Sequence, residues 1–319
     1  MERDVSSFAG NAIANRRTAV AMPNAILGSL RWPGRPDLPE GNPCWTYMVD
    51  GELEQYAVAI GHVENGRSHP FEVWILSNEQ PRCLGAVAKT LSADMRTQDR
   101  AWLNKKLEVL ESITGSLSID LPLGSSRLRA SSNSAAIARV IRYRLSQLGV
   151  SGPEVGEETP LVDALMHVRD AGHEGTLSWT ASITNEQTGD EFMVFLPEVE
   201  LGNGVHRPVA VRLSGRYPRE LDGLAALLTL DMAVVDVAWI GMKLRKLVDY
   251  DEPRGSFFAK VPGSGVTQRF PSIVAYLAQL IIHRFSMLGL LTSAGYPVVE
   301  MGVMVSVPGD AHNVLPFAA

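Results

Sequence analysis

The chain contains the same sequence pattern twice, and this internal repeat constrains its fold more than any other feature. Residues 81–110 align without a gap with residues 218–247, 137 positions later, and 13 of the 30 aligned positions are identical. Two unrelated segments of this length would share roughly two residues at ordinary residue frequencies. A long repeat predicts two copies of one structural unit. We therefore expect two similar domains that face each other like the halves of a covalently joined dimer.

The repeat extends on both sides of this block. Residues 137–150 match residues 277–290, now 140 positions apart, with six identities in 14. Upstream, Trp45 corresponds to Trp179. Each unit then covers about a hundred residues, the usual size of one domain. The predicted divisions are an N-terminal extended arm at 1–40, a first repeat at 41–150, a linker with a short helix at 151–176, a second repeat at 177–291 and a tail at 292–319.

Hydrophobic periodicity predicts strands followed by helices in each unit. Residues 56–61 and 71–76 form predicted strands around a turn at 62–69, and residues 192–196 and 208–213 are their counterparts. An apolar stripe predicts a helix from Leu84, repeated from Leu221. A second helix carries the tryptophans of the repeat, and a third ends at Gly149 or Gly289, where a C-terminal cap belongs. The linker helix is expected from Leu161 to about residue 170.

This order of elements predicts the fold class. Strands first and helices afterwards indicate an α+β domain with helices on one face of an antiparallel sheet. The complete prediction is a tandem duplication of this domain, arranged as a pseudo-two-fold dimer within one chain.

Composition and charge exclude several classes of protein. The 319 residues are 45% hydrophobic and 20% charged, as in an ordinary globular protein, and the net charge is −6. A negative chain is not expected to bind nucleic acid broadly, since such binding needs a basic surface. No apolar run is long enough for a membrane span or a signal peptide, so we expect a cytoplasmic protein. Cys44 and Cys83 have no neighbours at metal-ligand spacing, which predicts neither a disulfide framework nor a metal site.

Six repeated polar residues are candidates for binding a nucleotide or a partner. Arg82 and Arg219 precede a predicted helix, whose first turn attracts anions; the alternative is a solvated or structural arginine. Two lysines follow the repeated tryptophans by one helical turn, which permits a cation–π contact; the alternative is a packed tryptophan with an extended lysine. Two histidines border strands and could be ordinary surface residues. The full set is Arg82, Arg219, Lys106, Lys243, His69 and His206.

Other repeated residues are expected to be structural. Two aspartates lie beside the apolar stripe, where a salt bridge or a hydrogen bond is expected, and two more precede the tryptophan helix as N-caps. Retention in both copies while neighbouring residues differ indicates a requirement of the fold. The structural set is Asp94, Asp231, Asp99, Asp236, Trp102 and Trp239. No catalytic motif is present, so no catalytic residue is predicted.

Several blocks resemble the C-terminal accessory region of adenosylcobalamin-dependent (class II) ribonucleotide reductases, which belongs to the TSCPD domain family. They are RPDLP at 35–39, the strand start at Trp45, HVENGRSHPFEVW at 62–74 and LGAVAKTLSADMR at 84–96. The family's Thr-Ser-Cys-Pro-Asp motif corresponds to SSNSA at 131–135 and to RFPSI at 269–273, so its cysteine occurs in neither copy.

The resemblance implies an auxiliary or regulatory component of such a reductase. The radical cysteine, the reducing cysteine pair and the cobalamin site of the catalytic chain have no counterpart here, so adenosylcobalamin would be present only through a reductase partner. Two alternatives stay open. One is a free-standing nucleotide sensor or interaction module that receives phosphates at Arg82 and Arg219. The other is an enzyme acting in the groove between the two halves.

Overall fold

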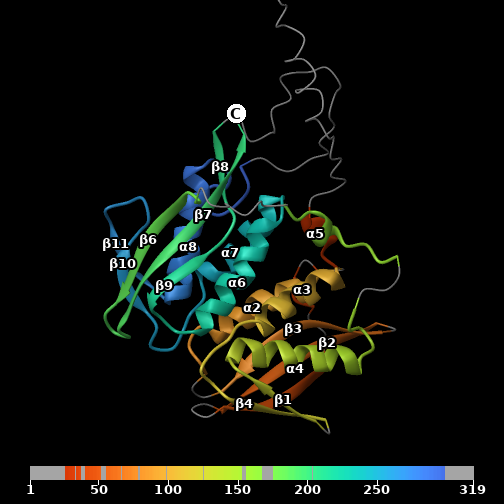
Figure 1. The fold of residues 1–319 in the computed structure, drawn as a ribbon. Helices are drawn as coiled ribbons and strands as arrows, with labels where there is room; N and C mark the ends of the chain where they lie inside the picture. The colour runs from red at the N-terminus through yellow and green to blue at the C-terminus, as the bar shows by residue number, and fades with distance from the viewer. Residues whose placement is uncertain are drawn as a thin grey trace, which may run out of the picture.

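The computed structural model describes residues 26–298, apart from 33, 37–39, 52–54, 66, 78–79, 98, 125, 153–155, 167–174 and 203. These residues form an α+β protein in which antiparallel sheets lie on the outside and most helices lie between them (Figure 1). No helix within these ranges is long and apolar enough to cross a membrane.

The first half of the chain forms a five-stranded antiparallel sheet with three helices. The strand order is β3-β2-β1-β4-β5. β2 and β3 pair along nearly their whole length, with one register shift at Gly61 and His62. The elements are β1 (Cys44–Asp50), β2 (Gln55–Asn65), β3 (Arg67–Leu76), α2 (Leu84–Met95), α3 (Arg100–Glu111), β4 (Ile119–Leu123), β5 (Ser126–Ala130) and α4 (Asn133–Gln147).

The second half has a similar order of elements, with one more strand. β7 pairs with β6, β8 and β9, and β10 and β11 form a separate two-stranded sheet. A 3-10 helix, η1 (Ile26–Ser29), and a short helix, α5 (Pro160–Asp163), lie outside the two halves. The elements of the second half are β6 (Ser178–Asn185), β7 (Asp190–Gly202), β8 (Val205–Pro208), β9 (Arg212–Arg216), α6 (Glu220–Ala233), α7 (Val237–Val248), β10 (Phe257–Lys260), β11 (Thr267–Phe270) and α8 (Ile273–Met287).

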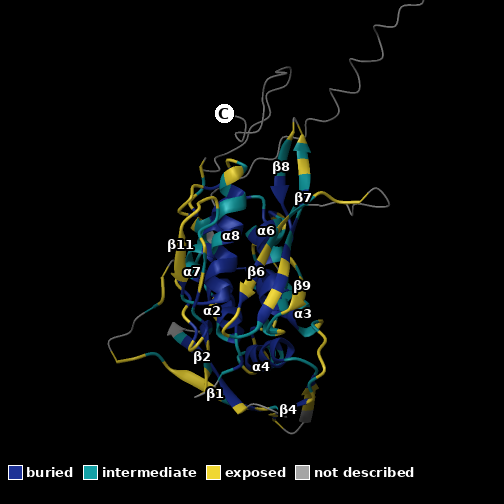
Figure 2. Cartoon of the chain, turned by 90° about the vertical axis from the view of Figure 1, so that its left-hand side faces the viewer, coloured by how far each residue is buried: buried dark blue, intermediate teal, exposed yellow. Residues whose placement is uncertain are grey.

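Helices from the two halves share the core. α2 packs against α6 and α7, and α3 packs against α6, so the interior surfaces of these helices are buried (Figure 2). Trp102 and Trp239 are completely buried, and their rings meet edge to face at 6.3 Å. Most of the apolar stripe predicted from Leu84 and from Leu221 therefore lies in one continuous core.

The predicted helix ends are confirmed. Asp99 accepts a hydrogen bond from the Trp102 amide at 2.8 Å, and Asp236 accepts one from the Ala238 amide at 2.9 Å. Gly149 and Gly289 follow α4 and α8 with φ of 68° and 70°. Only glycine adopts this left-handed conformation without steric cost, which explains why it ends both helices.

Other predicted boundaries differ from the structure. Most of 62–69 is strand and not turn, because backbone pairing between β2 and β3 continues through these polar residues. The hairpins β4–β5 and β10–β11 are absent from the prediction, since they are short and Pro122 interrupts the first strand pattern. The linker helix is α5, which ends at Asp163, and residues 167–170 lie outside the described residues. Of the predicted arm, residues 1–25 also lie outside them, whereas Ile26 begins η1 and is buried.

Replacement of Asp99 by Ala is expected to destabilise the protein by about 2 kcal/mol, more than an isolated N-cap. One carboxylate oxygen caps α3, and the other accepts hydrogen bonds from the amides of Leu161 and Val162 at 2.9 and 3.1 Å. Urea unfolding measures the loss. Asp99→Asn keeps one acceptor and should lose about half as much. A loss below 0.5 kcal/mol for the alanine variant would show that the bonds to the linker contribute nothing.

Candidate anion-binding site

The repeated lysines and aspartates form a crossed pair of buried salt bridges between the two halves. Lys243 Nζ lies 2.6 Å from Asp94 Oδ1, and Lys106 Nζ lies 2.7 Å from Asp231 Oδ1. All four side chains are at most 1% exposed. Each lysine from one half therefore neutralises an aspartate of the other half, and the predicted salt bridges of these aspartates are present.

Indole and backbone groups complete this network. Trp102 Nε1 donates to Asp94 Oδ1 at 2.8 Å, and Trp239 Nε1 donates to Asp231 Oδ1 at 2.7 Å. Each lysine also lies over the tryptophan one turn before it, at 4.6 Å for Lys106 and 4.8 Å for Lys243. The cation–π contact permitted by the sequence spacing is thus formed in both halves.

Burial opposes charge on this network. It raises the pKa of Asp94 and lowers the pKa of Lys106, in each case as the largest effect, while the opposite charge across the interface acts against it. The Oδ2 atoms of Asp94 and Asp231 find no hydrogen-bond partner among the described residues. Because the side chains of Lys106 and Lys243 are buried within this network, a ligand arriving from solvent does not reach them in this conformation.

The two candidate arginines lie in different environments. Arg82 forms a bidentate salt bridge with Asp190, at 2.6 and 3.1 Å. Arg219 has a side chain that is 73% exposed and lies 5.0 Å over the Tyr217 ring. It lines a cavity of about 510 Å³ together with Glu220 and Asp222, whose carboxylates offset its charge. Arg82 therefore serves an internal contact, and among the described residues that line the cavity Arg219 is the only cation.

The start of α2 already holds an anionic group of the protein. The Glu252 carboxylate accepts a hydrogen bond from the amide of Cys83, the residue before α2, and lies 3.9 Å from Arg82. The positive end of a helix attracts such a carboxylate as it would a phosphate. Burial raises the pKa of the Cys83 thiol well above its ordinary value, so this thiol is protonated at neutral pH.

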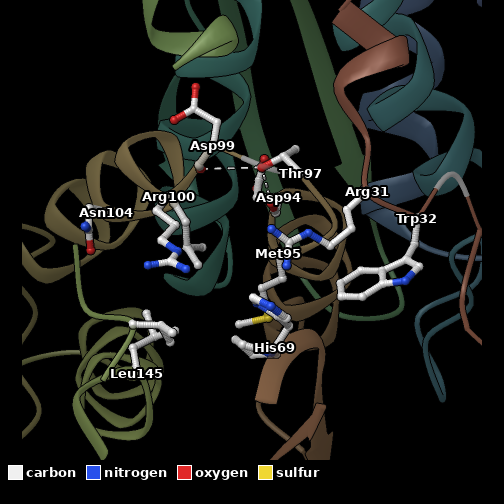
Figure 3. Close-up of a pocket in the computed structure, with 13 residues that line it drawn as sticks. Arg31, Trp32, His69, Asp94, Met95, Thr97, Asp99, Arg100, Asn104 and Leu145 are labelled. Carbon is white, nitrogen blue, oxygen red and sulfur yellow. Dashed lines mark hydrogen bonds between the residues drawn. The ribbon is translucent and has the colours of Figure 1, made fainter. Parts of the chain in front are cut away.

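The two candidate histidines lie on strands of different sheets, His69 on β3 and His206 on β8. His206 is half-buried on β8, opposite Glu200 of β7. His69 on β3 lies 6.3 Å from the Trp32 ring and lines a cavity of about 40 Å³. The guanidinium groups of Arg31 and Arg100 point into this small cavity from opposite sides, whereas the Asp99 carboxylate points away from it (Figure 3). A water or a small ion would fill it, but a nucleotide would not.

Another cavity, of about 450 Å³, lies between β3, α2 and the C-terminal end of α7. This volume falls in the range of small-molecule sites. Four cationic side chains and one carboxylate line it, so both halves of the chain contribute charge. The cations are Arg35, Lys89, Arg96 and Lys246, and the carboxylate is Asp251.

The positive charge of this cavity is only partly neutralised by the protein. Arg35 is paired with Glu72 at 2.7 and 3.0 Å, and Asp249 acts on Lys89. Lys246 has no ion pair with any residue that the structure describes. Burial and then the charges of Arg96, Lys243, Lys89 and Arg245 lower the pKa of Lys246. The last turn of a helix favours a cation, yet these four neighbours all repel it.

Aromatic and polar groups complete the wall. The Trp74 side chain lines the cavity and is 52% exposed. The Tyr250 hydroxyl is buried against the backbone of α2 at Gly85 and Ala86. Lys89 Nζ lies 5.9 Å from the Tyr250 ring centroid. The cavity therefore offers a flat apolar surface and a concentration of positive charge, which suit an anionic molecule with an aromatic ring.

Sequence reasoning missed most of this cavity because it selected residues that recur in both copies. The positions that correspond to Lys89 and Arg96 are Ala226 and Ala233, 137 residues later, and Lys246 corresponds to Val109. The signal that could have found these residues is the opposite one, a cation present in only one copy of an otherwise similar block.

We compared the chain with protein-family models, with curated proteins and with solved structures, and none of them matches it.

Proposed function

We propose that this protein binds a phosphate-bearing small molecule, in the first place a nucleotide, in the 450 Å³ cavity and that it performs no chemistry on it. One observation carries the proposal. Lys246 lies among cations beside a cavity of suitable size, and no described acidic side chain pairs with it. A protein normally pairs its partly buried charges, so an external anion is the simplest partner for this excess of positive charge.

The aromatic wall favours a nucleotide over inorganic phosphate. A base that stacks on an exposed tryptophan gains about 1–3 kcal/mol, and Trp74 offers such a surface. Lys89 of α2, Arg96 at the end of α2 and Lys246 of α7 would hold the phosphates through charge-assisted hydrogen bonds. No described residue cluster is suited to a metal ion, so we assign the binding to the cations.

A thermal-shift panel of ribo- and deoxyribonucleotides tests this function. A ligand at a hundredfold its dissociation constant should add about 2.7 kcal/mol to the free energy of unfolding. Lys246→Gln and Lys89→Gln should each weaken binding about tenfold, since each removes a charge-assisted bond. Lys105→Gln is the matched control, because Lys105 on α3 does not line the cavity. A flat panel, or equal weakening by all three variants, would contradict the proposal.

The sequence resemblance supports a second proposal, association with a class II ribonucleotide reductase as an auxiliary or regulatory component. It rests on the blocks at 35–39, 62–74 and 84–96, and Arg35, Trp74, Lys89 and Arg96 of the cavity lie within them. Adenosylcobalamin would belong to the catalytic chain of that partner. Co-elution with such a reductase is the expected result, and absence of association at micromolar concentration with no effect on turnover would exclude it.

We also infer that the two halves arose by duplication and are related by a local two-fold axis. The support is the reciprocity of the core, where each of the contacts made by Lys243, Asp94 and Trp102 has a counterpart made by Lys106, Asp231 and Trp239. A superposition of residues 84–147 on residues 220–287 that failed to align their three long helices would contradict this inference.

A further inference from the structure

The cations of the cavity flank one of the two buried salt bridges. Lys243 of α7 donates to Asp94 Oδ1 at 2.6 Å and to the carbonyl of Thr90 at 2.8 Å. Lys89 directly precedes Thr90, Arg96 follows Asp94 by two positions, and Lys246 follows Lys243 by three. The cavity and the salt bridge therefore belong to the same contact between α2 and α7.

This contact carries an excess of positive charge. Lys89 of α2 and Arg96, which directly follows α2, both act unfavourably on Lys246 of α7. Like charges on two packed helices repel each other, and the repulsion is strongest where water is partly excluded. Without an anion, this repulsion opposes the attraction between Lys243 and Asp94.

The reciprocal contact between α3 and α6 lacks this charge. Lys106 there donates to Asp231 at 2.7 Å and to the Leu227 carbonyl at 2.6 Å. The positions that correspond to the three cations are Ala226, Ala233 and Val109, all without charge. The core thus has two similar salt bridges, and the cationic cavity formed by the described residues adjoins the one between Lys243 and Asp94.

We propose that a single di- or triphosphate group binds per chain, bridges α2 and α7, and tightens that contact while leaving the contact between α3 and α6 unchanged. The inference rests on the proposed function and adds the ligand class, the stoichiometry and the element that responds. An anion between Lys89, Arg96 and Lys246 attracts both helices and removes their mutual repulsion. Ligand binding would then change one of the two equivalent helix contacts between the halves, the contact between α2 and α7.

Calorimetry and hydrogen exchange on the full chain test this inference, with ATP and inorganic tripolyphosphate as the probes. The expected stoichiometry is one per chain. At saturation, the amide hydrogens of α2 and of the C-terminal half of α7 should exchange at least about fivefold more slowly than without the probe. The change in α3 and α6 should be smaller. Binding of both probes shows that the phosphates suffice, and binding of ATP alone would assign the recognition to the base and overturn the ligand class.

A ligand-free experiment separates this inference from the proposed function. Lys246→Gln removes the repulsion, so its α2 and α7 amides should exchange more slowly than those of the unmodified protein, even without any probe. Lys89→Gln provides the same test from α2 if the first variant fails to fold, and Lys105→Gln should change nothing. Equal changes in both helix contacts, or faster exchange in the lysine variants, would overturn the inference. Failure of both probes to bind would instead overturn the proposed function.

Discussion

Replacement of Lys243 by Met is expected to lower the free energy of unfolding by roughly 3–5 kcal/mol, because it leaves the Asp94 carboxylate charged and buried without its partner. The Asp94 side chain is completely buried, and among the described residues the only other hydrogen bond to its carboxylate comes from the Trp102 indole. Urea unfolding measures the change. Lys106→Met should cause a loss of similar size, since Lys106 has the same role toward Asp231.

Removal of both charges of one pair is the control for this prediction. Lys243→Met combined with Asp94→Leu should recover most of the loss, because a buried salt bridge contributes little compared with apolar residues of similar volume. Asp120→Ala breaks an exposed pair with Arg129, whose side chains are 51% and 76% exposed, and should cost at most about 1 kcal/mol. A double variant that is no more stable than Lys243→Met would show that the loss comes from packing and not from the unpaired charge.

Replacement of Arg207 by Met is the second large effect, with an expected loss of about 3 kcal/mol. Arg207 is 1% exposed and donates to the carbonyls of Met232, Val234 and Val235, where α6 ends. These carbonyls have no helical partner, so the guanidinium group satisfies them. Burial lowers the pKa of Arg207 to about 10, and the group therefore stays charged at neutral pH.

Thermal and urea unfolding of the Arg207→Met variant give this loss directly. Arg212→Met is the matched control, because Arg212 is exposed on β9 and should change the free energy of unfolding by less than about 0.5 kcal/mol. Arg207→Lys keeps the charge but has one donor group in place of the planar guanidinium, so an intermediate loss is expected. Equal stability of the Met variant and the unmodified protein would mean that water satisfies these carbonyls.

The helices could be predicted well because their signals are local. Apolar spacing indicates α2 and α6, an aspartate begins α3 and α7, and glycine follows α4 and α8. The β4–β5 hairpin could not be predicted, since its strands are five residues long and its burial pattern depends on what covers the sheet. The α+β class is correct at this coarser level, although the hairpins β4–β5 and β10–β11 come after helices and not before them.

The sequence by itself determined which residues recur, and hence which side chains the core requires. It could not determine that Lys243 pairs with Asp94 and Lys106 with Asp231, because these partners lie 149 and 125 positions apart in the chain. Only the tertiary structure decided that the lysines are enclosed and that four other cations surround a cavity. The physical reason is that burial and charge pairing depend on the packing of distant segments, whereas caps and helical stripes depend on neighbours within a few residues.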